Sequence, residues 1–355
     1  MVALNNYSRL DRLIHRIAFS SPGIQITAAE IEERMFQSDL KDIETGPPIF
    51  ITSLPRAGTT ILLTALNSVP DLAPHLYRDM PFLMAPLLWS RLSGKFGKQA
   101  YLQERAHGDG ITIGFDSPEA FEEVIWKAFW PEFFKLDGIA LGTAQDFKDE
   151  ACTFLKRHFK KIVALRCKGQ PGPGRYISKN NGNISRLGLI SEIFPEADIL
   201  VPMRHPLTHA ASLHRQHKNF LTRHADDPFS RRYMQDIGHF EFGTLHRPIL
   251  FEDFARLSDG LTPACLDYWL AYWISAFRHI NQHREKLQIL GYEDMCRQGN
   301  TAGINLCERL DLDISHAPDI ARHFRPVPPP DATLAAYRSP LRDQAEALYR
   351  QCSET

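Results

Sequence analysis

The sequence lacks the features of a membrane protein and of a disulfide-bonded extracellular protein. Its longest uncharged apolar run, residues 80–89, is much shorter than the roughly 18 residues that span a bilayer. The N-terminus is interrupted by charged residues and has no signal-peptide pattern. The six cysteines form no C-x-x-C pair and no metal-ligand spacing, which indicates reduced thiols. These absences predict a cytoplasmic location, no integral membrane segment and no metal site.

The chain also lacks an excess of charge of either sign. Its 41 basic and 42 acidic side chains leave a net charge of −1 over 355 residues. Proteins that bind nucleic acid electrostatically carry an excess of positive charge on the binding surface. No nucleic-acid partner is therefore expected.

Apolar strands alternate with helical segments along the chain. This pattern predicts an α/β fold with a mainly parallel central sheet flanked by helices on both faces. The expected strands are residues 49–53, 175–178, 199–203 and 287–292. Ligands of such sheets bind at the carboxyl ends of the strands.

The chain divides into three predicted parts. Residues 1–45 form an N-terminal helical extension, whose second helix is expected to begin at Thr27 because Glu30 completes a capping box. Residues 46–320 form the main domain around the sheet. Residues 321–355 form a C-terminal tail and a last helix that packs on the core.

Residues 48–63 combine an apolar strand, a turn that contains proline and glycine, and the start of a helix. Backbone N–H groups and the positive end of a helix dipole meet in such a turn and bind phosphate. The turn differs from the ATP and GTP loop G-x-x-x-x-G-K-[ST]. Ser53 takes the place of its first glycine, Thr59 takes the place of its lysine, and the basic residue, Arg56, precedes Gly58. These differences favour another phosphate donor.

A second phosphate site is indicated by Arg204 and Ser212. Arg204 ends the strand 199–203, and Ser212 lies eight residues later on the following helix. An arginine fork and a hydroxyl together suit a phosphate. An arginine that only caps the strand and a serine on the helix surface fit the same pattern equally well.

Together these motifs resemble the bacterial-type family of sulfotransferases that use 3′-phosphoadenosine 5′-phosphosulfate (PAPS). The family's P-[RK]-[SA]-G-T-T motif, which holds the 5′-phosphosulfate, matches Arg56, Ala57, Gly58, Thr59 and Thr60. Its strand-end arginine and following serine, which hold the 3′-phosphate, match Arg204 and Ser212. Two weaker features also match: Lys179 after the middle strand, and Leu-Gly-Tyr-Glu-Asp-Met at residues 290–295.

The resemblance implies that residues 46–320 form a P-loop NTPase-like sulfotransferase core with PAPS as co-substrate and no metal. The sulfuryl group would pass in line to a hydroxyl, or to an amine, of a carbohydrate, lipid or small-molecule acceptor. By analogy with phosphoryl transfer, catalysis is then mainly positioning and cationic stabilisation of the departing oxygen. Arg56 and Lys179 are the candidates for that stabilisation.

The general base is not evident from the sequence. Sulfotransferases of phenols and steroids carry a histidine two residues after the strand-end lysine, where this chain has Asn181. An amide cannot accept the proton of the acceptor. Residues 117–126 are similar to the Phe-Glu-Glu segment of heparan sulfate N-sulfotransferases, which makes Glu123 a candidate base. Acidic residues that only favour the start of a helix are the alternative.

Histidines provide further candidates for the base. His107 lies beside Asp109 in a glycine-flanked loop and is either an oriented base or a solvent-exposed side chain. His75 and Asp79, just after the first helix of the domain, are weaker candidates.

Other assignments stay open at this stage. The phenol and steroid subgroup clasps the adenosine phosphate with a C-terminal Gly-x-x-Gly-x-x-Lys segment that is absent here. The arginines that could replace it are Arg231, Arg232, Arg322, Arg325 and Arg338. An aromatic run on one helix is predicted to be core, with a wall for the acceptor as the alternative: Trp269, Tyr272, Trp273 and Phe277. The insertions at residues 70–135 and 222–262 are expected to face the acceptor.

Two other functions compete with this interpretation. A P-loop kinase-like phosphotransferase would use the same turn, although it would need the missing lysine. A degenerate nucleotide-binding protein that lost its base and serves as a partner is the non-enzymatic alternative. The acceptor and the oligomeric state are not predicted.

Overall fold

Five parallel strands form the centre of the protein, which confirms the predicted α/β class. The computed structural model describes residues 9–93, 103–104, 112–113, 116–170, 172–327, 334 and 337–353. In spatial order the strands are β2 (Leu72–Ala73), β5 (Arg175–Lys179), β1 (Ile49–Ile51), β6 (Asp198–Met203) and β7 (Gln288–Gly291). All neighbouring strands run parallel, so their carboxyl ends share one edge of the sheet. A separate antiparallel pair consists of β3 (Gln103–Glu104) and β4 (Thr112–Ile113).

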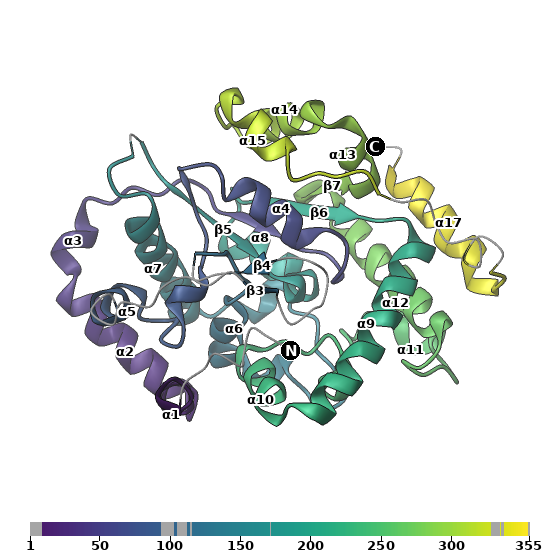
Figure 1. Cartoon of the computed structure of the whole chain (residues 1–355), viewed down its shortest axis with the longest axis horizontal. Coiled ribbons are helices and arrows are strands. Elements are labelled where there is room, and N and C mark those ends of the chain that lie inside the picture. Colours follow the sequence, from purple (N-terminus) through teal and green to yellow (C-terminus); the bar gives the residue numbers. More distant parts are fainter. Residues whose placement is uncertain are drawn as a thin grey trace.

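Helices surround the sheet (Figure 1). Before β5 they are α1 (Arg9–Ala18), α2 (Pro22–Met35), α3 (Gln37–Lys41), α4 (Thr59–Leu66), α5 (Pro86–Ser93), α6 (Glu123–Phe129) and α7 (Asp149–Arg166). After β5 they are α8 (Leu187–Ile193), α9 (Pro206–Asp226), α10 (Pro228–Ile237), α11 (Phe254–Leu257), α12 (Leu266–Gln282), α13 (Tyr292–Gln298), α14 (Asn300–Arg309), α15 (Ala317–Ala321) and α17 (Pro340–Ser353).

Alternating side chains of the strands bury both faces of the sheet. Ile49 and Ile51 of β1 pack with residues of α4, α14 and α15 on one face. Phe50, between them, points to the other face and packs with residues of α7, α8 and α12. Successive strand residues point to opposite faces, so a run without polar residues is what a doubly covered strand requires.

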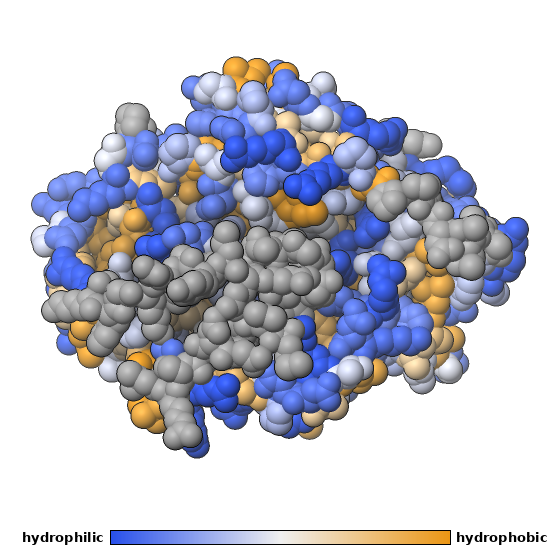
Figure 2. Space-filling view, viewed as in Figure 1, coloured by the Kyte–Doolittle hydropathy of each residue, from blue (hydrophilic) through white to orange (hydrophobic). Residues whose placement is uncertain are grey.

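Helix α9, which carries His209 and Ser212, begins three residues after β6 at the carboxyl edge of the sheet. Its inner face is buried through Leu213 and Phe220, and its outer face is mostly hydrophilic (Figure 2). None of the described helices is long and apolar enough to cross a membrane. Within the same residues, no cluster of three or more histidine, cysteine, aspartate or glutamate side chains is arranged to hold a metal.

Candidate active site

The turn between β1 and α4 has an unusual backbone. Arg56 has a φ of 73° and Gly58 a φ of 99°. A left-handed conformation costs a non-glycine residue roughly 1–2 kcal/mol, and such strain is typical of functional sites. A side chain at Gly58 would also meet another obstacle, because its Cβ would lie 2.3 Å from Cδ2 of Tyr292. Position 58 therefore favours glycine for two reasons: its backbone is left-handed, and Tyr292 leaves no room for a Cβ atom.

Helix α4 begins directly after this turn, at Thr59. The first N–H groups of a helix have no partner within the helix, and the helix dipole adds partial positive charge there. The buried Leu62 and Leu63 hold the helix against the sheet and thereby fix its direction. The start of α4 therefore directs backbone N–H groups and the positive end of its dipole to the carboxyl edge of the sheet, where an anion can bind.

Arg204 follows the end of β6 on the same edge. Its guanidinium lies 3.9 Å from Glu293, measured from Nε to Oε1, and the same carboxylate oxygen accepts a hydrogen bond of 3.0 Å from the backbone N–H of His205. Among the described residues, the buried Nε of Arg204 has no hydrogen-bond partner. A buried donor without a partner costs about 1–3 kcal/mol, and an anionic ligand would remove that cost.

His209 of α9 connects Arg204 to the turn. Its Nε2 donates a hydrogen bond of 2.8 Å to the carbonyl oxygen of Pro55. Burial, together with the charges of Arg204 and Arg56, lowers the pKa of His209 to about 3. Burial also lowers the pKa of Arg204, with a contribution from the charge of Arg56. The two arginines thus lie close enough to repel each other.

The remaining donor-binding candidates lie around these arginines. Ser212 is buried on α9, three residues after His209 and so on the same face of the helix. Lys179 is the buried last residue of β5 and pairs in register with Ile51 at the end of β1. The fold therefore brings Lys179, Arg204 and the turn, which are far apart in the sequence, to one edge of the sheet.

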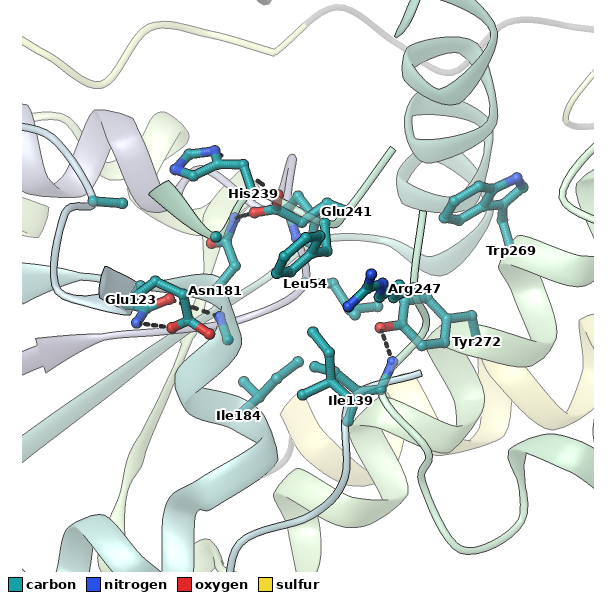
Figure 3. Close-up of a pocket in the computed structure, with 17 residues that line it drawn as sticks. Leu54, Glu123, Ile139, Asn181, Ile184, His239, Glu241, Arg247, Trp269 and Tyr272 are labelled. Atoms are coloured by element: carbon teal, nitrogen blue, oxygen red, sulfur yellow. Dashed lines mark hydrogen bonds and ion pairs between the residues drawn. The ribbon is translucent and has the colours of Figure 1, made fainter. Parts of the chain in front are cut away.

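A pocket opens beside the turn (Figure 3). The pocket is narrow in this conformation, with a cavity volume of about 30 Å³. Leu54 and Pro55 of the turn form one side, and Ile139, Ile184 and the aromatic rings of α12 line the interior. Trp269 and Tyr272 of the aromatic run are both buried and line the pocket, while Trp273 and Phe277 are core residues that do not.

Asn181 connects this pocket to the turn. Its Oδ1 accepts a hydrogen bond of 3.2 Å from Thr59 Oγ1, and its Nδ2 donates one of 3.3 Å to Glu241 Oε1. His239 Nδ1 lies 3.8 Å from the other oxygen of Glu241. Figure 3 shows Glu241, Asn181 and His239 grouped at one end of the pocket. A carboxylate only accepts hydrogen bonds, so the nitrogen of the Asn181 amide must face Glu241.

Glu123 lies on another wall of the pocket, at the first residue of α6. Its Oε2 accepts a hydrogen bond of 2.6 Å from Asn180 Nδ2 and also pairs with the guanidinium of Arg186, which is fully buried. The backbone of Gly238 packs against Glu123, so a Cβ at Gly238 would lie 2.5 Å from Glu123 Cγ. The Glu123 carboxylate is therefore held by a charge-assisted pair on one oxygen.

Neither histidine candidate for the base is placed at the pocket by the described residues. His107 and its neighbour Asp109 lie outside the described residues. His75 is buried, hydrogen-bonds through Nδ1 to Asp79 at 3.3 Å, and does not line the pocket. Burial raises the pKa of Asp79, but His75 and the charge of Arg166 outweigh burial and lower it. His75 and Asp79 thus belong to a buried polar network.

Sequence reasoning did not identify Glu241 or His239 as site residues, and it included Tyr292 only within the weaker match at residues 290–295. Glu241 follows α10, which ends at Gly238 in the left-handed conformation with a φ of 83°. It lies in the insertion at residues 222–262, which was expected to face the acceptor, but no local motif distinguishes it from other polar residues there. Its proximity to Asn181 arises only from the folded chain.

Solved structures of three bacterial sulfotransferases resemble the whole chain weakly. For sulfotransferase STF9 from Mycobacterium avium the identity is 13%, the coverage is 90% of this chain and 80% of that chain, and the TM-score is 0.46. For the sulfotransferase from Alicyclobacillus acidocaldarius these values are 16%, 86%, 96% and 0.42. For sulfotransferase STF1 from Mycobacterium tuberculosis H37Rv they are 14%, 98%, 86% and 0.43. At such values the matches support no conclusion about activity.

Sequence comparison is more informative. No curated protein matches the chain. The model of the sulfotransferase family matches residues 47–246, which is more than half of the chain and includes the turn, Lys179, Arg204, Ser212 and Glu241. The strand, turn and helix at residues 49–66 lie inside this match. The chain therefore belongs to the sulfotransferase family.

Proposed function

We propose that the protein is a PAPS-dependent sulfotransferase that transfers the sulfuryl group to a hydroxyl, or to an amine, of a small-molecule, lipid or carbohydrate acceptor. The observation that carries this proposal is that the turn with Arg56 and the end of β6 with Arg204 follow neighbouring parallel strands and are joined by the hydrogen bond from His209 to Pro55. A nucleoside triphosphate needs one continuous phosphate site. Two cationic groups on separate strand ends suit a ligand with separate 5′- and 3′-phosphates.

The residues present fit such a donor. The turn and the first N–H groups of α4, with Arg56, Ala57, Gly58, Thr59 and Thr60, would hold the 5′-phosphosulfate. Arg204 and Ser212 would hold the 3′-phosphate, and the partnerless Nε of Arg204 supports this assignment. PAPS supplies an activated sulfuryl group whose departure leaves negative charge on the bridging oxygen. Arg56 and Lys179 would stabilise that charge.

The six cysteines are all free, which supports the cytoplasmic location expected from the sequence. The division into residues 1–45, 46–320 and 321–355 and the absence of a metal requirement remain part of the proposal. Glu123 and His107 remain predicted candidates for the base, and Glu241 is a second carboxylate that lines the pocket beside Glu123.

Isothermal titration of the protein with 3′,5′-ADP and with ATP tests the donor assignment. We expect 3′,5′-ADP to bind at least tenfold more tightly than ATP, because only 3′,5′-ADP carries the 3′-phosphate for Arg204 and Ser212. Transfer of labelled sulfate from PAPS to any acceptor would establish the activity. Tight ATP binding without 3′,5′-ADP binding would favour a phosphotransferase instead. Binding of 3′,5′-ADP without any transfer would favour the nucleotide-binding partner protein.

A further inference from the structure

The acceptor must lose a proton during transfer, and the residue that follows Lys179 by two, Asn181, cannot take it. Asn181 is nevertheless fixed by two hydrogen bonds, from Thr59 and to Glu241. The carboxylate of Glu241 is thus two hydrogen bonds away from the first residue of α4, the helix that would bind the donor. A proton acceptor therefore exists beside position 181, and it comes from a distant part of the chain.

We propose that Glu241 is the general base of the transfer and that the pocket binds a hydroxyl carried on an apolar body. This inference rests on the proposed function, because it assumes a sulfuryl donor at the turn. In the step itself the acceptor oxygen forms a bond to sulfur while the bond between sulfur and the bridging oxygen breaks. The leaving 3′,5′-ADP keeps that electron pair, and the acceptor proton passes to a carboxylate oxygen of Glu241.

The loop that carries Glu241 is held in one conformation. The backbone N–H of His239 bonds to the carbonyl of Met234 at 2.9 Å, which closes the end of α10. The N–H of Arg247 bonds to the carbonyl of Phe240 at 2.8 Å, and His246 Nδ1 donates to the carbonyl of Glu241 at 2.7 Å. A base positioned in this way loses little freedom when the acceptor binds.

Glu241 is a more suitable base than Glu123, although both line the pocket. Arg186 pairs with the carboxylate of Glu123, whose side chain is 5% exposed. An adjacent guanidinium stabilises the ionised form and occupies Oε2, which leaves only Oε1 of Glu123 to accept a proton. The side chain of Glu241 is 27% exposed and is held by a neutral amide and by His239, at 3.8 Å. Its carboxylate keeps lone pairs available to the acceptor.

The interior of the pocket determines the class of acceptor. Its apolar lining includes Leu54, Ile139, Ile184, Ile249, Trp269 and Tyr272. The Tyr272 hydroxyl oxygen accepts a hydrogen bond of 3.0 Å from the N–H of Ile249, and its O–H remains a single donor on this wall. The polar side chains of the lining, among them Glu123, Asn180 and Arg247, could bond to some hydroxyls of a sugar. Each sugar hydroxyl that met an apolar side chain instead would cost about 1–3 kcal/mol. An aromatic or aliphatic alcohol avoids that cost.

The test uses Glu241→Gln and the matched control Glu252→Gln, which changes an exposed glutamate that does not line the pocket. The acceptors are benzyl alcohol, 4-nitrophenol and methyl glucoside, each with PAPS. At pH 8 benzyl alcohol needs a base, whereas 4-nitrophenol is largely ionised. We expect Glu241→Gln to lower kcat for benzyl alcohol at least about a hundredfold and kcat for 4-nitrophenol less than about tenfold. Affinity for 3′,5′-ADP should not change, and Glu252→Gln should match the wild type.

Each other outcome overturns a defined part of the proposal. An equal loss with both alcohols would show that Glu241 only shapes the pocket. An unchanged kcat for benzyl alcohol in Glu241→Gln, with a loss in Glu123→Gln, would assign the base to Glu123. Wild-type protein that binds 3′,5′-ADP but sulfonates neither alcohol, or prefers methyl glucoside, overturns the apolar acceptor class. Failure to bind 3′,5′-ADP instead overturns the proposed function.

Discussion

The side of the site that would bind the donor and the side that would bind the acceptor are built in different ways. The donor side consists of the turn at residues 53–58, the start of α4, Arg204 and α9. Its parts are strand ends and helix starts, so backbone geometry alone places them. The acceptor side is the pocket, and its lining comes from loops and helices between Leu54 and Tyr272. Side-chain contacts between distant segments place that lining.

This difference in construction indicates which side of the site tolerates amino-acid substitutions. A strand end and a helix start keep their geometry as long as the sheet folds, so the donor side can be fixed by a few residue types. The acceptor side depends on loops, whose residues can change without loss of the sheet. Asn181 is the point of contact, because it bonds to Thr59 on the donor side and to Glu241 on the acceptor side.

The largest expected effect lies on the donor side, at Arg56. We expect Arg56→Ala to lower kcat about a hundredfold, about 3 kcal/mol in barrier, because the departing oxygen loses its cationic partner. Steady-state kinetics with PAPS measures the effect. Arg256→Ala is the matched control, since Arg256 is 70% exposed and pairs only loosely with Asp253, at 3.8 Å. A kcat of Arg56→Ala within about threefold of the wild type would show that Arg56 binds the donor without assisting transfer.

Arg204 should affect binding more than chemistry. We expect Arg204→Ala to weaken 3′,5′-ADP binding by about 2 kcal/mol, roughly 30-fold, through loss of a charged hydrogen bond to the 3′-phosphate. Titration with 3′,5′-ADP and with 5′-AMP separates the two phosphates. The affinity for 5′-AMP, which has no 3′-phosphate, should change little. An equal loss of affinity for 3′,5′-ADP and for 5′-AMP would place Arg204 at the 5′-phosphate. It would contradict the assignment of separate residues to the two phosphates.

The strands of the sheet could be predicted from the sequence to within one or two residues. Buried parallel strands are continuous apolar runs, and turn residues mark their ends. β2 was missed because its two residues, Leu72 and Ala73, are too few to form a pattern. The start of α2 was predicted wrongly at Thr27. The helix begins at Pro22, where the Ser21 side chain accepts a hydrogen bond from the N–H of Gly23.

The site was predictable only where its residues are local in sequence. The turn at residues 53–58 forms one contiguous motif, and Arg204 follows an obvious strand. The presence of Asn181 indicated that another residue must act as the base. It did not indicate which part of the chain supplies that residue. Helix α10 did carry readable signals, with Asp227 and Pro228 at its start and Gly238 at its end. They would have placed Glu241 just after a helix, but only tertiary structure places it beside Asn181.

His209 makes the donor side sensitive to acid. Burial holds the pKa of His209 at about 3, below the ordinary value of 6.5, so the unfolded chain binds a proton there that the folded chain does not. Stability is therefore lost as the pH falls from 6.5 towards 3. One unit below 6.5 this group costs about 1.4 kcal/mol. We expect His209→Gln, which keeps a donor for Pro55, to reduce the loss between pH 8 and pH 5.5 by that amount in urea unfolding. An unchanged loss would assign the acid sensitivity to other buried histidines.

The smallest expected effect lies on the acceptor side, at Tyr272. Its hydroxyl accepts the hydrogen bond from the buried N–H of Ile249 and so fixes one wall of the pocket. Tyr272→Phe leaves that N–H without a partner, and we expect KM for benzyl alcohol to rise about fivefold, equivalent to about 1 kcal/mol. Affinity for 3′,5′-ADP should stay the same, because Tyr272 does not touch the turn. Tyr337→Phe, whose hydroxyl bonds to Asp267 and does not line the pocket, is the control. A loss of 3′,5′-ADP affinity in Tyr272→Phe would mean that the two sides are coupled and that Asn181 transmits changes between them.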